Sequence, residues 1–186
     1  VAKQLTLGGG GTQQCWDIAV TASGNLAVVG SSGEYGGAAA KLWHLSPSLV
    51  ELGAFYVKPG GAAAVWTSVL PQTDGTWLVG GSEDSLGRSR GWALLLGADG
   101  EIVGNAFFGN AGFNAAVERW LQMPDGALRG AGRITAQGSS DSDGLLVAAS
   151  SGLLNLATTT IAAQTGVLRS VVAVPQLEAL DLDGNN

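Results

Sequence analysis

Few side chains in this sequence have the chemistry of a catalytic or metal-binding group. The 186-residue chain contains one histidine, His44, and one cysteine, Cys15. Catalysis by histidine needs a carboxylate or a nucleophile set against the ring, and the segment KLWHL offers none. A zinc site needs several His and Cys ligands. We therefore interpret His44 as an outward-facing or hydrogen-bonded strand residue and Cys15 as a small core residue, and we expect no cofactor.

One polar stretch, SSDSDG, has part of the spacing of a calcium-binding loop. Ser139, Asp141, Asp143 and Gly144 stand at positions 1, 3, 5 and 6 of the EF-hand pattern. Position 12 is Ser150 instead of the bidentate glutamate, and position 1 is only a serine. Asp141 and Asp143 are therefore calcium candidates, and an ordinary polar loop is the interpretation that the sequence favours.

The aromatic side chains include six tryptophans: Trp16, Trp43, Trp66, Trp77, Trp92 and Trp120. Trp16 and Trp66 occupy equivalent or adjacent positions in a repeat described below, so we expect them to pack between repeats. Trp43, Trp77 and Trp92 have no tryptophan at the equivalent positions. A side chain that breaks a repeat is a candidate for ligand contact, with core packing as the alternative.

The charge pattern excludes several classes of partner. Nine Lys and Arg against fifteen Asp and Glu give a net charge of −6. Nucleic-acid binding relies on a basic patch, and the basic residues are scattered along the chain. No apolar run reaches the roughly 18 residues of a membrane-spanning helix, so we expect no membrane insertion. Hydrophobic residues make up 46% and charged residues 13%, which is too apolar for disorder.

Composition also favours an extracellular, cell-surface or periplasmic location. Lysine is scarce, glycine is abundant, and the isoelectric point is near 4.5. The opening segment VAKQLTLGGG lacks the basic-then-apolar pattern of a signal peptide, so we expect such a peptide to be absent or already removed. The single cysteine excludes an intrachain disulfide framework. A cytosolic protein with one free thiol remains the alternative.

Three similar phrases punctuate the chain at a regular distance: ASGNLAVVG, TDGTWLVGG and PDGALRGAG. Their turn glycines, Gly24, Gly75 and Gly126, are 51 residues apart. An apolar run precedes each glycine (CWDIAV, VWTSVL and VERWLQM), and a second run follows it. Self-similarity at a fixed period indicates a repeat architecture.

Each repeat contains four short apolar runs separated by Gly, Asp, Ser or Pro, which predicts four strands joined by turns. The third runs, which include WALLL and LLVAA, are apolar on both faces, as a sheet covered on both sides requires. AAVERWLQM carries the best helix signal, but its position in the repeat predicts a strand. The turns before the fourth strands are expected at Ser48, Gly100 and Gly152.

The predicted fold is all-β: a β-propeller-like array of four-stranded antiparallel blades within a single domain, 1–186. Three full repeats (8–60, 61–111 and 112–163) are followed by an incomplete fourth (164–186). The fourth lacks its second strand, either because the strand is deleted or because residues are missing between Gln176 and Leu177. The second explanation is favoured, since a deleted central strand leaves backbone groups unpaired. A closed ring needs about four to eight blades, so the array would belong to a larger ring or close by association.

The segments AVWTSVLPQTDGTWLVGG, GWALLLGADGEIVGNAFFGNAG and PDGALRGAG resemble a family of secreted and surface bacterial β-propeller proteins with tandem blades. The resemblance extends over about 8–186. It implies the fold rather than an activity, because members of this family act mostly as binding or scaffold modules.

Three functions are compatible with these patterns. The first is a non-enzymatic binding or scaffold module that contacts a protein partner, or another copy of itself, through blade edges and the loops 31–38, 82–90 and 133–142. The second is a structural subunit of a large surface assembly, which differs from the binding module only in that its partner is permanent. The alternative is the propeller fragment of a polysaccharide-acting hydrolase or lyase, whose candidate carboxylates are Asp17, Asp74, Asp125 and Asp141.

Overall fold

The computed structural model describes residues 4–7, 10–34, 37–58, 62–85, 87–108 and 112–149, and the backbone of 159–161 and 169–171. The fold is all-β. Eleven strands form three antiparallel sheets of four, four and three strands, and a separate short pair lies further along the chain. Within the described residues, the chain has no helix with the length and apolar character needed to span a membrane.

Each sheet is a simple meander in which consecutive strands are hydrogen-bonded neighbours. The first sheet contains β1 (Gln13–Val20), β2 (Leu26–Ser32), β3 (Ala39–Leu45) and β4 (Glu51–Val57). The second contains β5 (Ala64–Pro71), β6 (Trp77–Ser85), β7 (Arg88–Leu96) and β8 (Ile102–Phe108). The third contains β9 (Phe113–Gln122), β10 (Leu128–Ala136) and β11 (Ser142–Ala149), and the short pair is β12 (Thr159–Ile161) with β13 (Arg169–Val171).

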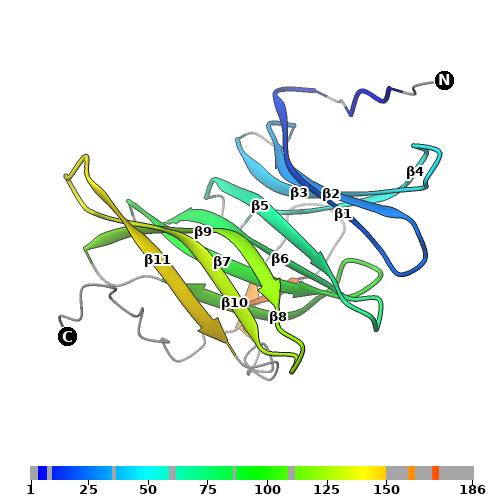
Figure 1. Ribbon diagram of the computed structural model, residues 1–186. Helices are drawn as coiled ribbons and strands as arrows, with labels where there is room; N and C mark the ends of the chain where they lie inside the picture. The colour runs from blue at the N-terminus through cyan, green and yellow to red at the C-terminus, as the bar shows by residue number, and fades with distance from the viewer. Residues whose placement is uncertain are drawn as a thin grey trace.

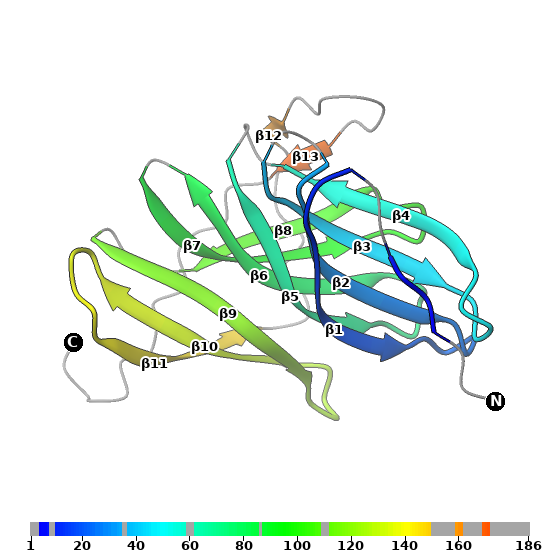
Figure 2. The ribbon, with the colours of Figure 1, turned by 90° about the horizontal axis from the view of Figure 1, so that it is seen from above.

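The sheets follow one another across the molecule, and their faces pack together (Figures 1 and 2). The strand β5 packs against β1 and β2 on one side and against β9 on the other. This order confirms the strands expected from the apolar runs. It also confirms that AAVERWLQM lies in a strand, β9, rather than in a helix.

The turns between the first two strands of the sheets have the same geometry. Gly24, Gly75 and Gly126 have φ angles of 81°, 87° and 81°, in the left-handed region that glycine adopts without strain. Each glycine N–H donates to the carbonyl oxygen three residues earlier. The expected turn glycines are therefore confirmed.

A β-bulge interrupts the first strand of every sheet at an equivalent position. The extra residues are Trp16, Thr67 and Glu118, which are 51 residues apart. A glycine of the second strand faces each bulge, because the backbones approach so closely that a Cβ would meet a carbonyl oxygen at 1.7, 1.9 or 2.0 Å; these glycines are Gly30, Gly81 and Gly132. The bulge and its glycine therefore form one unit of local structure, present three times.

Two hydrophobic clusters fill the spaces between the sheets. The first joins side chains such as Val29 and Leu42 of the first sheet to Trp66 and Leu94 of the second. The second cluster joins the opposite face of the second sheet to the third: Leu78, Ala93, Phe108, Val117, Trp120 and Leu145 are among its members. The second sheet is therefore covered on both faces, which explains why the segment 92–96 of β7 is apolar on both faces.

Two polar side chains that are buried in the second sheet, Asn105 and Glu83, have partners within the same sheet. The Trp92 indole N–H donates to Asn105 Oδ1 at 2.6 Å. Arg90 Nε donates to Glu83 Oε1 at 2.5 Å, and the guanidinium lies 3.9 Å from the centroid of the Phe107 ring. Pairing of this kind offsets the desolvation of a carboxylate that is only 1% exposed.

Neighbouring sheets are also linked by a repeated hydrogen bond just after the bulge. Val69 N–H donates to Asp17 Oδ2 at 3.1 Å, and Trp120 N–H donates to Ser68 Oγ at 3.1 Å. Asp17 and Ser68 are 51 residues apart, as are the two donors. A short polar side chain of one sheet thus satisfies a backbone N–H of the next.

Two expectations for the first sheet are wrong. Trp66 is fully buried between sheets, but Trp16 is 53% exposed because it occupies the bulge. Cys15 is exposed rather than a core residue, although its equivalents Trp66 and Val117 are fully buried. In the described part of the chain no further sheet covers this side of β1.

Parts of the repeat prediction fall outside the described residues. The fourth strand expected in the third repeat lies mostly in 150–158, and the incomplete fourth repeat is described only as the backbone of 169–171. The segment 82–90, expected to be a loop, is instead mainly strand, since β6 extends to Ser85 and β7 begins at Arg88.

Candidate functional site

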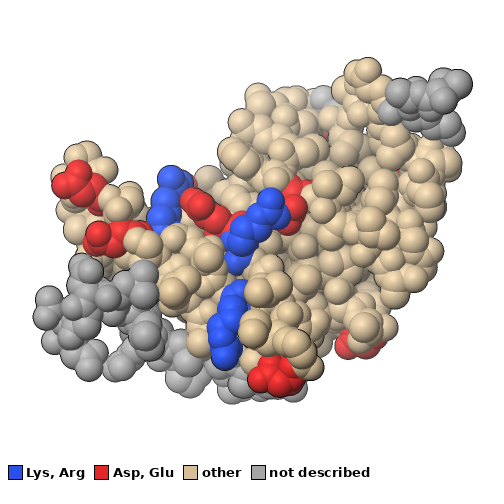
Figure 3. Space-filling view, in the orientation of Figure 1, with Lys and Arg blue, Asp and Glu red and all other residues tan. Residues whose placement is uncertain are grey.

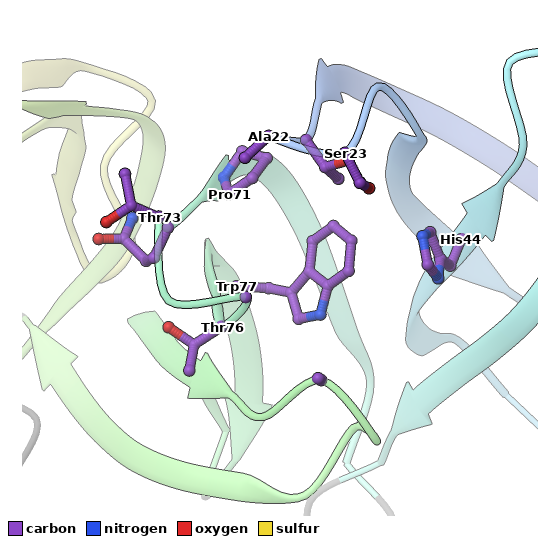
Figure 4. A pocket seen from close by; sticks show the side chains of 11 residues that line it. Ala22, Ser23, His44, Pro71, Thr73, Thr76 and Trp77 are labelled. Atoms are coloured by element: carbon purple, nitrogen blue, oxygen red, sulfur yellow. The ribbon is translucent and has the colours of Figure 1, made fainter.

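A cavity of about 260 Å³ lies between the first and second sheets, at the end where β1 turns into β2 and β5 turns into β6 (Figure 4). Its walls come from four turns or strand ends, far apart in the sequence. The lining residues are Thr21, Ala22, Ser23, His44, Pro71, Gln72, Thr73, Gly75, Thr76, Trp77 and Ala98.

Each wall is positioned by the meander of its sheet. The β1–β2 turn supplies Ser23 and its neighbours, and the β5–β6 turn supplies the segment 71–76. His44 lies near the end of β3, and Trp77 begins β6. Because the hairpin turns of both sheets lie at the same end, the packing of the sheets brings these residues together.

The rings of His44 and Trp77 are in edge-to-face contact, with centroids 5.1 Å apart and planes inclined at 66°. Trp77 is 4% exposed, and His44 is half-buried. Trp77 Nε1 and His44 Nε2 are both buried and have no hydrogen-bond partner among the described residues. His44 therefore faces the second sheet, and the expectation that it points outward is wrong.

Four of the residues that line the cavity carry hydroxyl groups: Thr21, Ser23, Thr73 and Thr76. Thr21 Oγ1 and Ser23 Oγ lie 2.9 Å apart in the β1–β2 turn. In the β5–β6 turn, the N–H and hydroxyl of Thr76 donate to Asp74 Oδ1 at 3.0 and 2.7 Å. These two bonds hold the pKa of Asp74 below its usual value.

No Asp, Glu, Lys or Arg lines this cavity. Asp74 belongs to the same turn as several lining residues, but its carboxylate is used by Thr76. The cavity is thus a mostly apolar space with several neutral hydrogen-bonding groups. Such a lining suits the binding of an uncharged small molecule better than acid–base chemistry.

The next junction along the chain has aliphatic side chains at the corresponding positions. Leu95 takes the place of His44, and Leu128 takes the place of Trp77, each 51 residues later. Leu128 is 6% exposed and belongs to the second hydrophobic cluster, against which Leu95 packs. The polar pair is therefore specific to the junction between the first two sheets.

Among the three tryptophans that break the repeat, Trp77 alone lines this cavity. Trp43 is 1% exposed and packs with Val28 and Leu45, with the Lys41 ammonium 5.0 Å from its ring centroid. Trp92 is fully buried between Trp66 and Phe107. Trp43 and Trp92 therefore occupy core positions.

The calcium candidates lie at the end of the β10–β11 connection. Asp141 N–H donates to Ser139 Oγ at 3.0 Å, and Asp143 pairs with Ile134 within the sheet. In the part of the chain that the structure describes, no group of three or more His, Cys, Asp or Glu side chains is placed to hold a metal ion. Nothing in this loop adds a ligand to the pattern seen in the sequence.

The four carboxylates considered for polysaccharide chemistry lie in separate elements with local roles. Asp17 lies in β1, where its carboxylate accepts a hydrogen bond from the Val69 N–H and pairs with Arg119. Asp74 and Asp125 accept hydrogen bonds within their own turns. Asp141 precedes β11. The structure does not assemble them into one acid–base pair.

A second cavity of about 190 Å³ opens at the opposite end of the same two sheets. It lies beside the half-exposed Trp16 and includes residues from the segments 31–38 and 82–90, which the sequence favours as contact segments. The lining residues are Gln14, Trp16, Ser31, Ala38, Ala63, Ala64, Val65, Ser82 and Asp84.

Sequence reasoning found Trp77 through its departure from the repeat, and it missed His44. The repeats contain a signal that singles out His44, because the equivalent residue of the next repeat is Leu95. A polar side chain at a position that is apolar in the next repeat indicates a local difference in packing. The contact with Trp77 could not be inferred, because it depends on how two sheets meet.

Comparison with known proteins gives no family. No family model matches the sequence, and no curated protein matches it. A solved structure with a similar arrangement is a protein of unknown function from Bacteroides caccae, determined at 1.35 Å resolution, with a TM-score of 0.42 and 14% sequence identity. The match covers 70% of this chain and 46% of that one, so this chain spans less than half the length of that protein.

Proposed function

We propose that this chain is a non-enzymatic binding module of the β-propeller-like type, and that it docks another protein module through the outer side of its first sheet. The observation that carries the proposal is an apolar stripe on β1 formed by Cys15, Ile18 and Val20, here called the β1 stripe. Ile18 is 58% exposed and Val20 66% exposed. The β2 partners of these residues alternate along their strand, so the three share one face.

At two of the three positions, the equivalent residues of the second and third sheets are buried by a neighbouring sheet. Cys15 corresponds to Trp66 and Val117, which are fully buried. Val20 is the exception, because it corresponds to the half-buried Pro71 and the exposed Gln122. Ile18 corresponds to Val69 and Trp120, which are 5% and 7% exposed. Covering the β1 stripe would remove a comparable apolar area from water, at roughly 25 cal/mol per Å². An exposed row of large apolar side chains in an otherwise buried position is typical of a protein-binding surface.

Part of the same face is already covered within the chain. Val28 and Trp43 are buried, and Leu7 packs against their cluster. Lys41 is paired with Glu34 at 3.0 Å, so its charge is compensated. The partner that fits the β1 stripe is therefore an apolar sheet face, of the kind that the first sheet itself presents to the second.

The far side of the third sheet has a different character. Arg129 and Arg133 share a face of β10, and both are exposed. Figure 3 shows basic side chains over the region of β9–β11, with acidic side chains beside them. Arg129 stands where Ala27 and Leu78 are fully buried in the preceding sheets. Suppose that the first sheet of a second copy packed on the third sheet in the way that neighbouring sheets of one chain pack together. These arginines would then be buried against the apolar β1 stripe, which is costly.

This asymmetry favours a different protein module over a head-to-tail copy as the partner.

The propeller-like architecture is supported by the repeated bulges, turn glycines and inter-sheet hydrogen bonds. A surface or extracellular location is part of the same proposal. It rests on the acidic, glycine-rich and lysine-poor composition.

The thiol of Cys15 allows a direct test, because it lies in the β1 stripe and is the only cysteine. Its alkylation by a maleimide is measured for the 186-residue chain alone and for the protein in its native assembly, both under native conditions. Partial burial raises the pKa of this thiol, so both samples are compared at the same pH, near 8.5. We expect at least a tenfold lower rate in the assembly.

Two variants test whether the protection of Cys15 depends on the β1 stripe rather than on the third sheet. Ile18→Lys should restore fast alkylation in the assembled sample, because a lysine cannot be buried there without a partner. The control is Leu121→Lys, at a residue that is 61% exposed on the third sheet. It should leave the protection unchanged. Equal alkylation rates in the isolated and assembled protein would overturn the proposal.

A further inference from the structure

We propose that the cavity beside His44 and Trp77 is a binding site for a small, uncharged and mostly apolar molecule, about one substituted ring in size, that carries a hydrogen-bond acceptor. This activity is separate from protein docking by the β1 stripe. The proposal rests on the volume of the cavity, its charge, two unpartnered nitrogens and the contrast with the next junction.

The volume of the cavity sets the size of the ligand. An apolar cavity of about 150 Å³ holds a benzene molecule, and sites for drug-sized ligands begin at about 300 Å³. At about 260 Å³ this cavity lies between these values. A single ring with one or two substituents therefore fits the available space.

The lining sets the charge of the ligand. None of the eleven lining residues is Asp, Glu, Lys or Arg. Burying an ionised group without a counter-charge costs several kcal/mol, so a carboxylate or ammonium ligand would gain nothing here to offset its lost hydration. An uncharged ligand avoids this cost.

Two nitrogens set the polarity of the ligand. Trp77 Nε1 and His44 Nε2 are buried without a hydrogen-bond partner among the described residues, and an unsatisfied buried donor costs about 1–3 kcal/mol. The indole N–H can only donate, so it requires an acceptor. Both nitrogens are shielded from solvent and from the cavity in this conformation. Contact with the ligand therefore requires the half-buried imidazole of His44 to rotate when the ligand binds, and this rotation is part of the proposal.

The polar pair is not needed for packing. At the next junction the same positions are held by Leu95 and Leu128, which fill the space between two sheets with aliphatic side chains. Two leucines would pack the space between the sheets without leaving a buried nitrogen unpaired. Histidine and tryptophan at these positions therefore lower the stability of the fold. A ligand that satisfies their nitrogens supplies the reason for this difference.

Phenol, benzene and benzoate serve as probes that share one ring and differ in polarity and charge. Each is titrated into the ¹⁵N-labelled 186-residue chain, and the indole N–H signal of Trp77, identified with Trp77→Leu, is followed by NMR. We expect phenol to shift this signal saturably, and benzoate to bind at least tenfold more weakly. Benzene should bind more weakly than phenol, because it offers no conventional acceptor.

Two kinds of variant test whether the binding occurs in this cavity. The double variant His44→Leu/Trp77→Leu reproduces the side chains of the next junction and should lower phenol affinity at least tenfold. Ala98→Leu fills the cavity from an exposed turn position. It should lower phenol affinity to a similar extent while both His44 and Trp77 are retained. In these variants binding is followed by isothermal titration calorimetry, and Trp16→Leu is the control that should bind phenol normally.

Each result decides the proposal. Loss of phenol binding in Ala98→Leu, with normal binding in Trp16→Leu, supports it even if the double variant fails to fold. The proposal is overturned if phenol produces no saturable shift, if benzoate binds as well as phenol, or if Ala98→Leu binds phenol as tightly as the unmodified chain.

Discussion

Asp17 and Arg119 connect the first strands of the first and third sheets through an ion pair, with Asp17 Oδ1 and Arg119 Nη1 2.5 Å apart. The strand β5 of the second sheet packs against both of these strands. The other carboxylate oxygen of Asp17 accepts the hydrogen bond from Val69 N–H of β5. A single carboxylate therefore binds both of the other sheets at the line where their first strands approach one another.

The two bonds of Asp17 should differ in their contribution to stability. Arg119→Ala removes only the ion pair, and Arg119 is largely exposed, so we expect a loss of at most about 1 kcal/mol. Asp17→Ala also leaves the Val69 N–H without its acceptor, and we expect a loss of about 1–3 kcal/mol. Urea denaturation measures both values. Equal losses in the two variants would show that the inter-sheet hydrogen bond contributes nothing.

The equivalent bond at the next junction provides an independent measurement. Ser68→Ala leaves the Trp120 N–H unpaired at a site where Ser68 is 1% exposed, so a similar loss of about 1–3 kcal/mol is expected. No ion pair contributes to this value. A loss much below that of Asp17→Ala would assign the difference to the charge of Asp17 rather than to the repeated hydrogen bond.

The glycines that face the bulges should not tolerate a side chain. A Cβ at Gly81 would lie 1.9 Å from Val65 O, so Gly81→Ala must separate β5 from β6 at this point. We expect a loss of more than about 3 kcal/mol, as for severe overpacking. The matched control is Gly53→Ala in β4, where nothing lies within 4 Å of the added carbon. Thermal unfolding followed by circular dichroism should show little change for the control and a large decrease in Tm for Gly81→Ala.

The parts of the fold that the sequence predicts are those determined locally. A glycine in a tight turn has the same requirement for positive φ in every repeat, so Gly24, Gly75 and Gly126 mark the hairpins directly. Burial depends on the neighbouring sheet and is not a local property. For this reason Cys15 is exposed, although its repeat equivalent Trp66 is fully buried.

The candidate site was only partly predictable for the same reason. Trp77 stands out because its equivalents are leucines, and the structure places it in a cavity. Its contact with His44 joins two sheets whose relative position the sequence does not contain. The turn before β4 contains Ser48, as expected, and its positive φ occurs at the next residue, Leu49.

The lowered pKa of Asp74 predicts a loss of stability in acid. Hydrogen bonds from the Thr76 N–H and hydroxyl favour the carboxylate, so the folded pKa lies below the reference value of 3.8. The stabilisation is fully present above that value and is lost as the pH falls through the folded pKa. Asp74 is exposed, so solvent screens this interaction, and Asp74→Ala should lower the free energy of unfolding at pH 7 by less than about 0.5 kcal/mol, and by less still near pH 2.

The corresponding turn of the third sheet supplies the control for this prediction. Asp125 accepts a hydrogen bond from the Ala127 N–H, and the alanine has no hydroxyl to add a second bond. Asp125→Ala should therefore cost less than Asp74→Ala at pH 7. Urea denaturation of both variants at pH 7 and pH 2 makes the comparison, and a cost of Asp74→Ala that does not change with pH would contradict the prediction.

The turn before β4 offers a stabilising substitution. Leu49 has a φ of 63°, in the left-handed region that costs a non-glycine residue about 1–2 kcal/mol, and the equivalent residue of the second sheet is Gly100, with a φ of 81°. Leu49→Gly removes this strain but gives the unfolded chain about 0.5–1 kcal/mol of extra conformational freedom. The net gain should be about 0.5 kcal/mol, or about 1–2 °C in Tm.

The reverse change at the equivalent turn should have a much larger and opposite effect. A Cβ at Gly100 would lie 2.0 Å from Phe55 Cδ1, in addition to imposing the strain of a positive φ. Gly100→Leu should therefore lose more than about 2 kcal/mol, since the side chain collides with a ring that packs against the core between the first two sheets. Differential scanning calorimetry of the two variants tests the pair. If Leu49→Gly lowered Tm, the contacts of the Leu49 side chain would outweigh the strain of its backbone, and the two turns would not be equivalent in energy despite their matching hydrogen bonds.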